Sequence, residues 1–192
     1  MSDDDATALI AGAYRKISLR VLPLVVISYV AAYLDRVNVG FAKAQMQADL
    51  GISDAVYGLA AGIFFIGYFA FEIPGNIMLQ CVGASRWLGS IMLVWARVSA
   101  LTAFVTGATQ FYVMRFLLGA AEAGFSPGVT FYLSGWYTAR RWGRAYGWYI
   151  VGIPLAGVLG GPLSGAIIHA FDGVLGISGW RWLFLLETLP SI

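Results

Sequence analysis

The sequence predicts an all-α integral membrane protein that crosses the bilayer several times. Of the 192 residues, 59% are hydrophobic and 11% are charged, whereas about a quarter of the residues in a soluble domain are charged. Five apolar runs follow one another, each about as long as the ~20 residues that a spanning helix needs, and a sixth begins near Trp180. A soluble core of this size could not bury so much apolar surface.

The first two predicted spans differ in their charge. The first covers residues 22–41, between a basic cluster and a polar turn, and contains the neighbouring charges Asp35 and Arg36. The second covers residues 56–82 and contains one charge, Glu72. Because ionisable side chains are costly in lipid and commonly mark a transport pathway, each is a candidate functional residue.

The third and fourth predicted spans also contain charges. Residues 87–107 include Arg97, which could pair with Glu72, pair with a residue of a missing half, or depart from any functional pattern. Residues 111–133 include Arg115 and Glu122, which are seven positions apart and therefore lie on one helix face. We expect Gly119, between them, to leave room for a neighbouring helix or a ligand.

The fifth predicted span, residues 147–170, has no formal charge and carries glycine at every fourth position from Gly157 to Gly165. That spacing allows either close helix packing or a flexible, gating helix. The sixth span starts near residue 180, and at about 1.5 Å per residue it covers roughly 20 Å of a ~30 Å hydrocarbon core. We therefore expect the sequence to stop within this span.

The loop charges predict the orientation. With the N-terminus in the cytoplasm, the inner loops contain Arg15, Lys16, Arg20, Arg86, Arg140, Arg141 and Arg144, and the outer loops contain only Lys43 and Arg181. This bias follows the positive-inside rule. We expect residues 1–20 to form a cytoplasmic tail and residues 21–192 to form the transmembrane bundle of an inner-membrane protein.

The composition and motifs exclude several functions. A single cysteine, Cys81, and a single histidine, His169, leave no multi-ligand Cys/His metal site in this chain. A net charge of +2 offers no basic face for nucleic acid. The sequence also lacks the phosphate-binding loop, the serine nucleophile elbow and the zinc-protease motif. We therefore expect no enzyme, no cofactor, no metal and no nucleic-acid partner.

The depth of the charged residues predicts where they meet. If the first span runs outward and the fourth runs inward, Asp35, Arg36, Arg115 and Glu122 share one level of the bilayer. A cavity at that level, lined also by Tyr33 and Asn38, would offer carboxyl, guanidinium, phenol and amide groups. Arginine suits a carboxylate ligand, and a buried carboxyl can carry a proton. The alternative is that these charges only neutralise each other between helices; Glu72 fits gating or packing equally well.

Several stretches carry a family resemblance: residues 33–42 (YLDRVNVGFA), 71–76 (FEIPGN), 115–128 (RFLLGAAEAGFSPG), 161–165 (GPLSG) and 179–184 (GWRWLF). They resemble the anion:cation symporter family of the major facilitator superfamily, which includes bacterial phthalate, tartrate and sugar-acid permeases. The resemblance implies twelve helices in two six-helix halves with the substrate between them. This chain is similar to the N-terminal half, with its sixth helix truncated.

The resemblance also implies roles for individual residues. Asp35 and Glu122 would carry protons, Arg36 and Tyr33 would contact the anionic substrate, and Arg115 would modulate Glu122 as its ion partner. Asn38 is predicted to contact substrate from its place on the first span. The chain departs from the usual pattern after the second span, where Cys81 and Ser85 occupy positions that are commonly basic.

The function predicted from these features is proton-coupled symport of a small organic anion, such as a carboxylate, sugar acid or aromatic acid, by alternating access. Its partners would be the anion, protons, the lipid bilayer and a missing C-terminal six-helix half. Two alternatives remain open. One is a six-helix half-transporter that needs a second copy or a separate partner half. The other is a membrane sensor that does not transport.

Overall fold

The computed structural model describes residues 3–189 of the chain, and those residues form helices and turns without a β-strand. Residues 1–2 of the predicted tail and 190–192 of the predicted sixth span lie outside this range. The helices are α1 (Asp3–Leu50), α2 (Asp54–Val82), α3 (Ala84–Thr102), α4 (Ala108–Glu122), α5 (Phe125–Trp136), α6 (Ala139–Ile150), α7 (Gly152–Phe171) and α8 (Gly179–Leu186), with a short 3-10 turn, η1 (Val174–Gly176), before α8.

Helices occur in the order of the predicted spans, with different boundaries. The tail and the first predicted span form one continuous helix, α1. The fourth span is divided into α4 and α5, and the fifth into α6 and α7. Within the described residues, three helical segments are long and apolar enough to cross a membrane by length and composition: Gly12–Leu50, Asp54–Val82 and Ala139–Phe171.

Both divided spans are interrupted shortly before a proline. α4 ends at Glu122, five positions before Pro127, and α6 ends at Ile150, four positions before Pro154. Proline donates no backbone hydrogen bond and crowds the carbonyl four residues earlier, so a helix tends to break there. Membrane helices also tolerate proline, and Pro162 lies inside the continuous α7.

A hydrogen bond joins the two interruptions. The Tyr149 hydroxyl, one residue before the end of α6, donates to Ser126 Oγ near the start of α5 over 3.1 Å. The Tyr149 ring also stacks on Tyr29 of α1, with ring centroids 4.0 Å apart. The two broken spans are therefore tied to each other and to α1.

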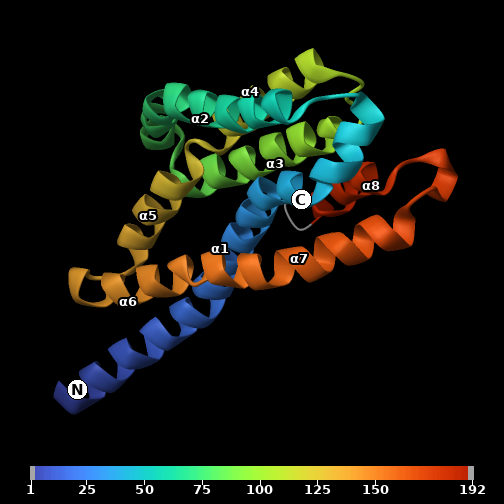
Figure 1. Cartoon of the computed structure of the whole chain (residues 1–192). Coiled ribbons are helices and arrows are strands. Elements are labelled where there is room, and N and C mark those ends of the chain that lie inside the picture. The colour runs from blue at the N-terminus through green and yellow to red at the C-terminus, as the bar shows by residue number, and fades with distance from the viewer. Residues whose placement is uncertain (1–2, 190–192) are drawn as a thin grey trace.

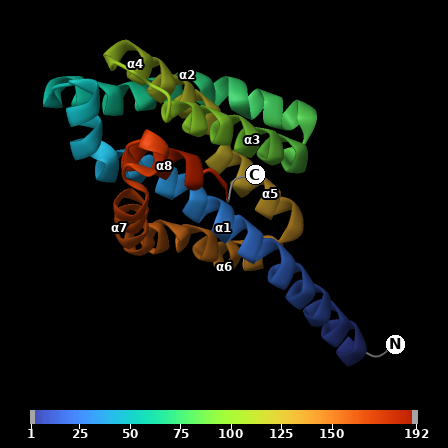
Figure 2. The same cartoon turned by 90° about the vertical axis from the view of Figure 1, so that its right-hand side faces the viewer.

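The helices form two groups with α1 between them (Figures 1 and 2). α2, α3 and α4 lie together on one side, and α6 and α7 lie on the other. α2 and α4 approach closely because a Cβ at Gly119 would collide with the carbonyl of Phe64, and one at Gly67 would collide with that of Phe116. Gly119 thus makes room for a neighbouring helix, which is one of the two roles predicted for it; the other was room for a ligand.

The glycines repeated at every fourth position of the fifth span make few close contacts with other helices. Among the described residues, nothing lies within 4 Å of a Cβ built at Gly157 or Gly165. The close approaches of α7 to α1 occur at Gly152, where a Cβ would lie 3.0 Å from Tyr29, and at Gly160, where it would lie 3.2 Å from Leu34. Gly161 of the repeat makes only ordinary contact, at 3.6 Å from Phe41. The face that α7 turns to α1 is therefore rotated away from the predicted stripe.

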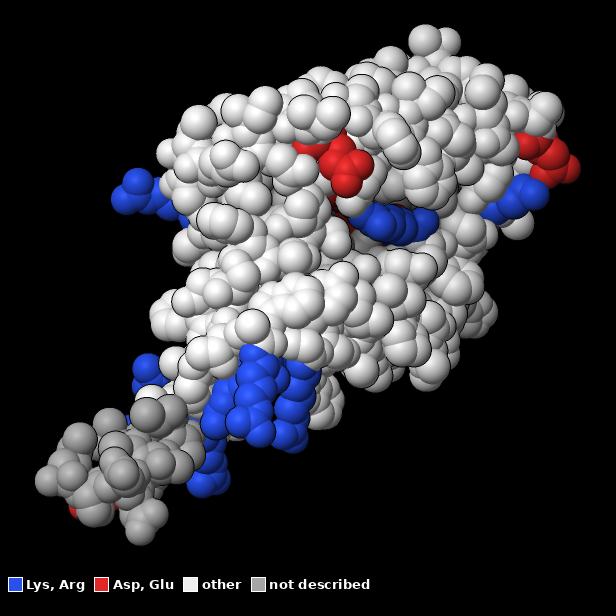
Figure 3. All heavy atoms as spheres, turned by 90° about the vertical axis from the view of Figure 1, so that its left-hand side faces the viewer, with Lys and Arg blue, Asp and Glu red and all other residues white. Residues whose placement is uncertain are grey.

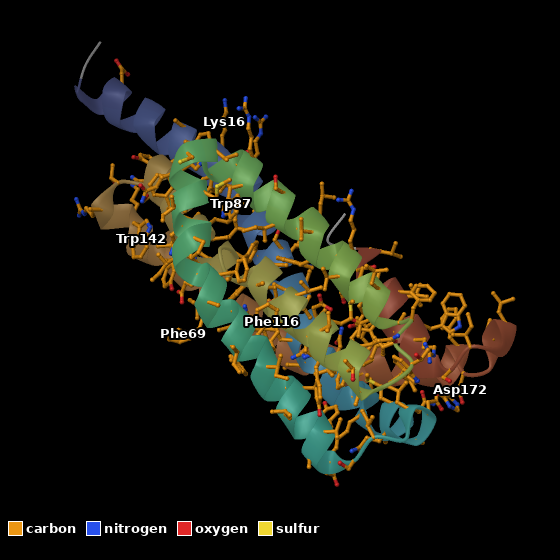
Figure 4. The ribbon with its side chains drawn as sticks, turned by 90° about the horizontal axis from the view of Figure 1, so that it is seen from above. Lys16, Phe69, Trp87, Phe116, Trp142 and Asp172 are labelled. Atoms are coloured by element: carbon orange, nitrogen blue, oxygen red, sulfur yellow. The ribbon has the colours of Figure 1, made fainter. Side chains whose placement is uncertain are left out.

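The chain has two distinguishable ends. Lys16, Trp87 and Trp142 lie toward one end of the bundle, and Asp172 lies toward the other (Figure 4). Helices that alternate in direction place successive loops at opposite ends of the bundle, and these residues follow that arrangement. Phe69 of α2 points out of the bundle (Figure 4) and is 80% exposed, as a lipid-facing side chain would be.

Candidate functional site: charged residues around the middle of α1

A buried ion pair joins α1 to α4. Arg36 Nε lies 2.6 Å from Glu122 Oε2, and the pair combines a hydrogen bond with the attraction of opposite charges. The Glu122 side chain is fully buried, whereas the Arg36 side chain is 26% exposed. These two charges therefore do lie at one level, and of the two side chains only that of Arg36 is partly exposed.

Aromatic rings of α2 contact the guanidinium groups of both Arg36 and Arg115. The Arg36 guanidinium lies 5.1 Å from the Tyr68 ring centre and 5.6 Å from that of Phe64. The Arg115 guanidinium lies 4.8 Å from the same Phe64 ring. Electron-rich ring faces attract cations, most strongly where water is excluded. Phe64 thus keeps two positive groups close together.

Arg115 does not take the role of Glu122's direct ion partner that the family resemblance implied. Within the described residues Arg115 forms no salt bridge, and its Nε and Nη1 atoms are buried without a hydrogen-bond acceptor. Arg36 occupies the carboxylate instead. The physical reason is depth, because seven residues separate Arg115 from Glu122 by about 10 Å along the axis of α4.

Asp35 faces a different helix from its neighbour Arg36. Its Oδ1 atom accepts a short hydrogen bond from the Ser99 hydroxyl of α3, and its Oδ2 atom is buried without a partner among the described residues. Successive residues of an α-helix point about 100° apart. Asp35 therefore contacts α3, whereas Arg36 contacts α4.

Asn38 shares the side of α1 that carries Asp35. Ser164 of α7 lies between Asn38 and Glu187, with its Oγ 3.5 Å from Asn38 Oδ1 and 3.1 Å from Glu187 Oε1. Asn38 Nδ2 and Glu187 Oε2 are buried without a partner in the described part of the chain. The residues expected to line a single cavity thus contact different helices: Arg36 pairs with Glu122 of α4, whereas Asp35 and Asn38 meet hydroxyl groups of α3 and α7.

Tyr33 and Glu72 lie beside these groups. Tyr33 is half-buried and packs edge-on against Tyr29, with ring centroids 6.2 Å apart. Glu72 lines a cavity of about 540 Å³ with Tyr68 and with residues of α5 and α6. Tyr68 lines this cavity and also contacts Arg36, so the cavity lies beside the ion pair. In Figure 3, acidic and basic atoms lie next to each other in a hollow near the middle of the upper part of the molecule.

The interaction considered for Glu72 and Arg97 does not form. Arg97 is exposed on α3, and neither residue takes part in a salt bridge within residues 3–189. Glu72 is half-buried at the cavity wall.

Several residues of the two groups were not singled out from the sequence. Glu187 was not selected because it lies beyond the first five predicted spans, although a carboxylate in an apolar run was the signal used elsewhere. Ser99 and Ser164 are single hydroxyls in apolar helices, which gives no distinctive pattern. Phe64 and Tyr68 are four residues apart and share a helix face, but aromatic pairs at this spacing are common in membrane helices.

Three helical segments of membrane length and buried charges between the helices are the features of a membrane transport protein of the α-helical class. Residues 25–192 match the profile of the Major Facilitator Superfamily, so the chain belongs to that superfamily. The match confirms the fold class, and membership in a transporter family means that the protein is not an enzyme.

Relatives place the chain more closely. It is 56% identical over 179 residues to a proposed metabolite transport protein, NicT, of Pseudomonas putida, which covers 93% of this chain and 41% of NicT. It is 51% identical over 178 residues to a proposed tartrate transporter of Agrobacterium vitis, again covering 93% of this chain and 41% of the relative. The chain thus spans about two fifths of the relatives' length, and the resemblance to anion:cation symporters is confirmed.

A solved structure supports the fold independently. A bacterial homologue of the human lysosomal transporter Spinster, in an inward-facing and unoccupied conformation, superposes with a TM-score of 0.81 at 21% identity. The match covers 93% of this chain and 41% of that protein. At this identity the likeness concerns the fold alone.

Proposed function

We propose that this chain is the N-terminal six-helix half of a proton-coupled symporter that imports a small organic anion. The observation that carries the proposal is the Arg36–Glu122 ion pair, in which a partly exposed guanidinium is held by a fully buried carboxylate. A proton bound at Glu122 would neutralise that carboxylate and free the guanidinium fork of Arg36. A substrate carboxylate would then bind the freed fork through two parallel hydrogen bonds.

The balance of charge around Phe64 supports an anionic substrate. Arg36 and Arg115 both contact this ring, and Glu122 is the one carboxylate in a salt bridge with either of them among the described residues. Protonation of Glu122 would leave two guanidinium groups facing the same region. Because charge is costly to bury without compensation, an incoming anion would be strongly favoured there.

Asp35 is proposed as the second proton-carrying group, and Tyr33 and Asn38 as substrate contacts. Asp35 has one buried oxygen without a partner in the described chain, so it has an acceptor free for a proton. Asn38 faces Ser164 in this conformation and would reach a substrate beside Arg36 only after α1 turns or α7 moves. Its contact would therefore belong to a later step of the transport cycle.

The proposed location is the bacterial inner membrane, with the N-terminus in the cytoplasm, as the loop charges favour. In that orientation α2 runs inward, and the cavity lined by Tyr68 and Glu72 lies on the cytoplasmic side of Arg36. Glu72 is proposed as a gating group at this opening. The region between the ion pair and the cytoplasm would then be the release path of the substrate.

Uptake measurements on the complete reading frame that contains this sequence test the proposal. Reading the source DNA past the codon for Ile192 defines that frame. Membrane vesicles containing the protein would be given labelled tartrate, aromatic acids and sugar acids, with and without an inward proton gradient. We expect one class to accumulate with the gradient and to lose accumulation when a protonophore is added. Accumulation that ignores the proton gradient would contradict the coupling.

Two conservative variants separate coupling from binding. Glu122→Gln should abolish accumulation against a gradient yet retain exchange of substrate across the membrane, because the amide cannot release a proton. Arg36→Lys should lose both, because the ammonium group has no planar fork. A matched Lys43→Arg change, in the exposed pair with Asp54, should alter neither. Binding by Arg36→Lys at unchanged affinity would refute the role of Arg36.

A further inference from the structure

A second, unassigned cavity lies where the N-terminal part of α1 passes α6. Its volume is about 720 Å³, and its lining includes four arginines: Arg15, Arg140, Arg141 and Arg144. None of the described residues that line it carries a carboxylate. Figure 3 shows basic side chains gathered at this end of the molecule, beside the N-terminal part of α1.

Specific contacts build this cavity. The Tyr137 hydroxyl, just after α5, donates a 3.0 Å hydrogen bond to Ser18 Oγ of α1. The Tyr137 ring also stacks on Tyr14, with centroids 6.3 Å apart. The Arg141 guanidinium lies 4.3 Å from the Tyr14 ring centre. These contacts fix α1 against the start of α6 and orient one of the arginines.

An exposed stripe continues from the cavity along α6 and α7. Arg140, Arg144, Trp148, Val151 and Leu155 follow one another at intervals of three or four residues, which places them on one helix face. The stripe passes the end of α6 because Val151 keeps helical angles, φ −58° and ψ −22°. Trp148 is 52% exposed, Val151 38% and Leu155 41%.

The order of side chains along the stripe matches the depth profile of one lipid leaflet. Cations come first, then a tryptophan, and then aliphatic side chains. Basic groups contact phosphate at the surface, tryptophan prefers the interfacial layer, and aliphatic groups lie among the acyl chains. A soluble anion would use the arginines but would leave the apolar part of the stripe uncovered.

We propose that this cavity binds the phosphodiester headgroup of an anionic phospholipid, with its acyl chains along Trp148, Val151 and Leu155. Arginine binds phosphate through two parallel hydrogen bonds, and four arginines without a lining carboxylate favour a negatively charged headgroup. The assignment to the cytoplasmic leaflet rests on the proposed orientation. Headgroup binding itself does not depend on that orientation or on transport.

Native mass spectrometry of the purified full-length protein tests the proposal. The protein would be titrated with phosphatidylglycerol and phosphatidylcholine of equal chain length. We expect phosphatidylglycerol to bind at least tenfold more tightly, and the double variant Arg140→Gln/Arg144→Gln to lose most of that preference. The control is Arg86→Gln/Arg97→Gln, which removes the same charge from exposed positions on α3 and should keep the preference. Equal binding of the two lipids, or an unchanged preference in the cavity variant, would overturn the proposal.

Further arms distinguish the headgroup from other anions and binding from folding. Inorganic phosphate at millimolar concentration should compete weakly; displacement of the lipid by phosphate at comparable concentration would identify a free-phosphate site and overturn the lipid assignment. Trp148→Ala should weaken the binding of long-chain phosphatidylglycerol more than that of a short-chain form, and equal effects on both would contradict the acyl-chain placement.

If the glutamine double variant does not fold, Arg140→Lys/Arg144→Lys keeps the charge. We expect it to retain the preference for phosphatidylglycerol at a severalfold weaker affinity, and loss of that preference in a folded lysine variant would also overturn the proposal.

Discussion

The two sides of α1 present buried polar groups in opposite ways. On the side of α2 and α4, Arg36 meets Glu122 in a salt bridge, rests on aromatic rings and remains 26% exposed. Asp35 and Asn38 instead turn toward α3 and α7, where the hydrogen-bond partners found among the described residues are hydroxyl groups and Ser164 links Asn38 to the Glu187 carboxylate; all of these groups are buried. One helix thus separates an open, ion-paired group from a closed, acid-rich group. Neighbouring residues of a sequence motif need not act on the same ligand.

The largest expected effect comes from breaking the open side. Arg36→Ala leaves Glu122 buried without its cation, and such a loss typically costs about 3–5 kcal/mol of stability. We expect a marked fall in the unfolding temperature of the detergent-solubilised full-length protein. Arg36→Ala/Glu122→Gln removes both charges and should recover much of that loss without recovering anion binding. Equal unfolding temperatures for the wild type and Arg36→Ala would show that the ion pair does not stabilise the bundle.

A second variant affects the closed side alone. Asp35→Asn preserves shape and keeps an oxygen that accepts the Ser99 hydrogen bond. We expect proton-driven accumulation to be lost while anion affinity changes by less than about threefold, because the Arg36 side is untouched. Isothermal binding and vesicle uptake measured on the same preparation separate the two properties. Normal accumulation in this variant would remove Asp35 from the proton pathway.

A third, smaller effect tests whether Ser164 holds the closed side together. Ser164→Ala deprives Glu187 Oε1 and Asn38 Oδ1 of their nearest hydroxyl. Leaving buried polar groups unpaired typically costs about 1–3 kcal/mol. We expect a modest fall in unfolding temperature, with Ser134→Ala on the exposed part of α5 as the control. If both serine variants unfold at the same temperature as the wild type, the hydroxyl does not stabilise the closed side.

The sequence predicted the level of each charged residue along its helix better than it predicted which face each helix turns to its neighbours. Counting residues along each span placed Arg36 and Glu122 at one level, since the rise of a helix is constant. Arg115 is excluded by its distance along α4, but which residue of α1 meets Glu122 depends on how α1 turns against α4. The pattern of charges carries no information on that rotation.

The same limit explains the glycines of α7. Their four-residue spacing fixes which of them share a face but not what that face meets. Gly160, outside the repeat, is the one packed close to Leu34. Glu187 could have been found from the rule that selected Glu122, a carboxylate in an apolar run, had the residues beyond the first five predicted spans been included.

Because α4 ends at Glu122, this residue lies directly at the break between α4 and α5. Glu122 closes α4, and the chain passes through Gly124, with φ −87° and ψ 0°, into α5. α5 forms a wall of the cavity that lies beside Arg36, and Ser126 near its start is bonded to Tyr149 beside the second interruption. A change of charge at Glu122 therefore acts at a joint. Turning α5 about that joint would pull on α6 through the tyrosine, so that two walls of the bundle would swing together.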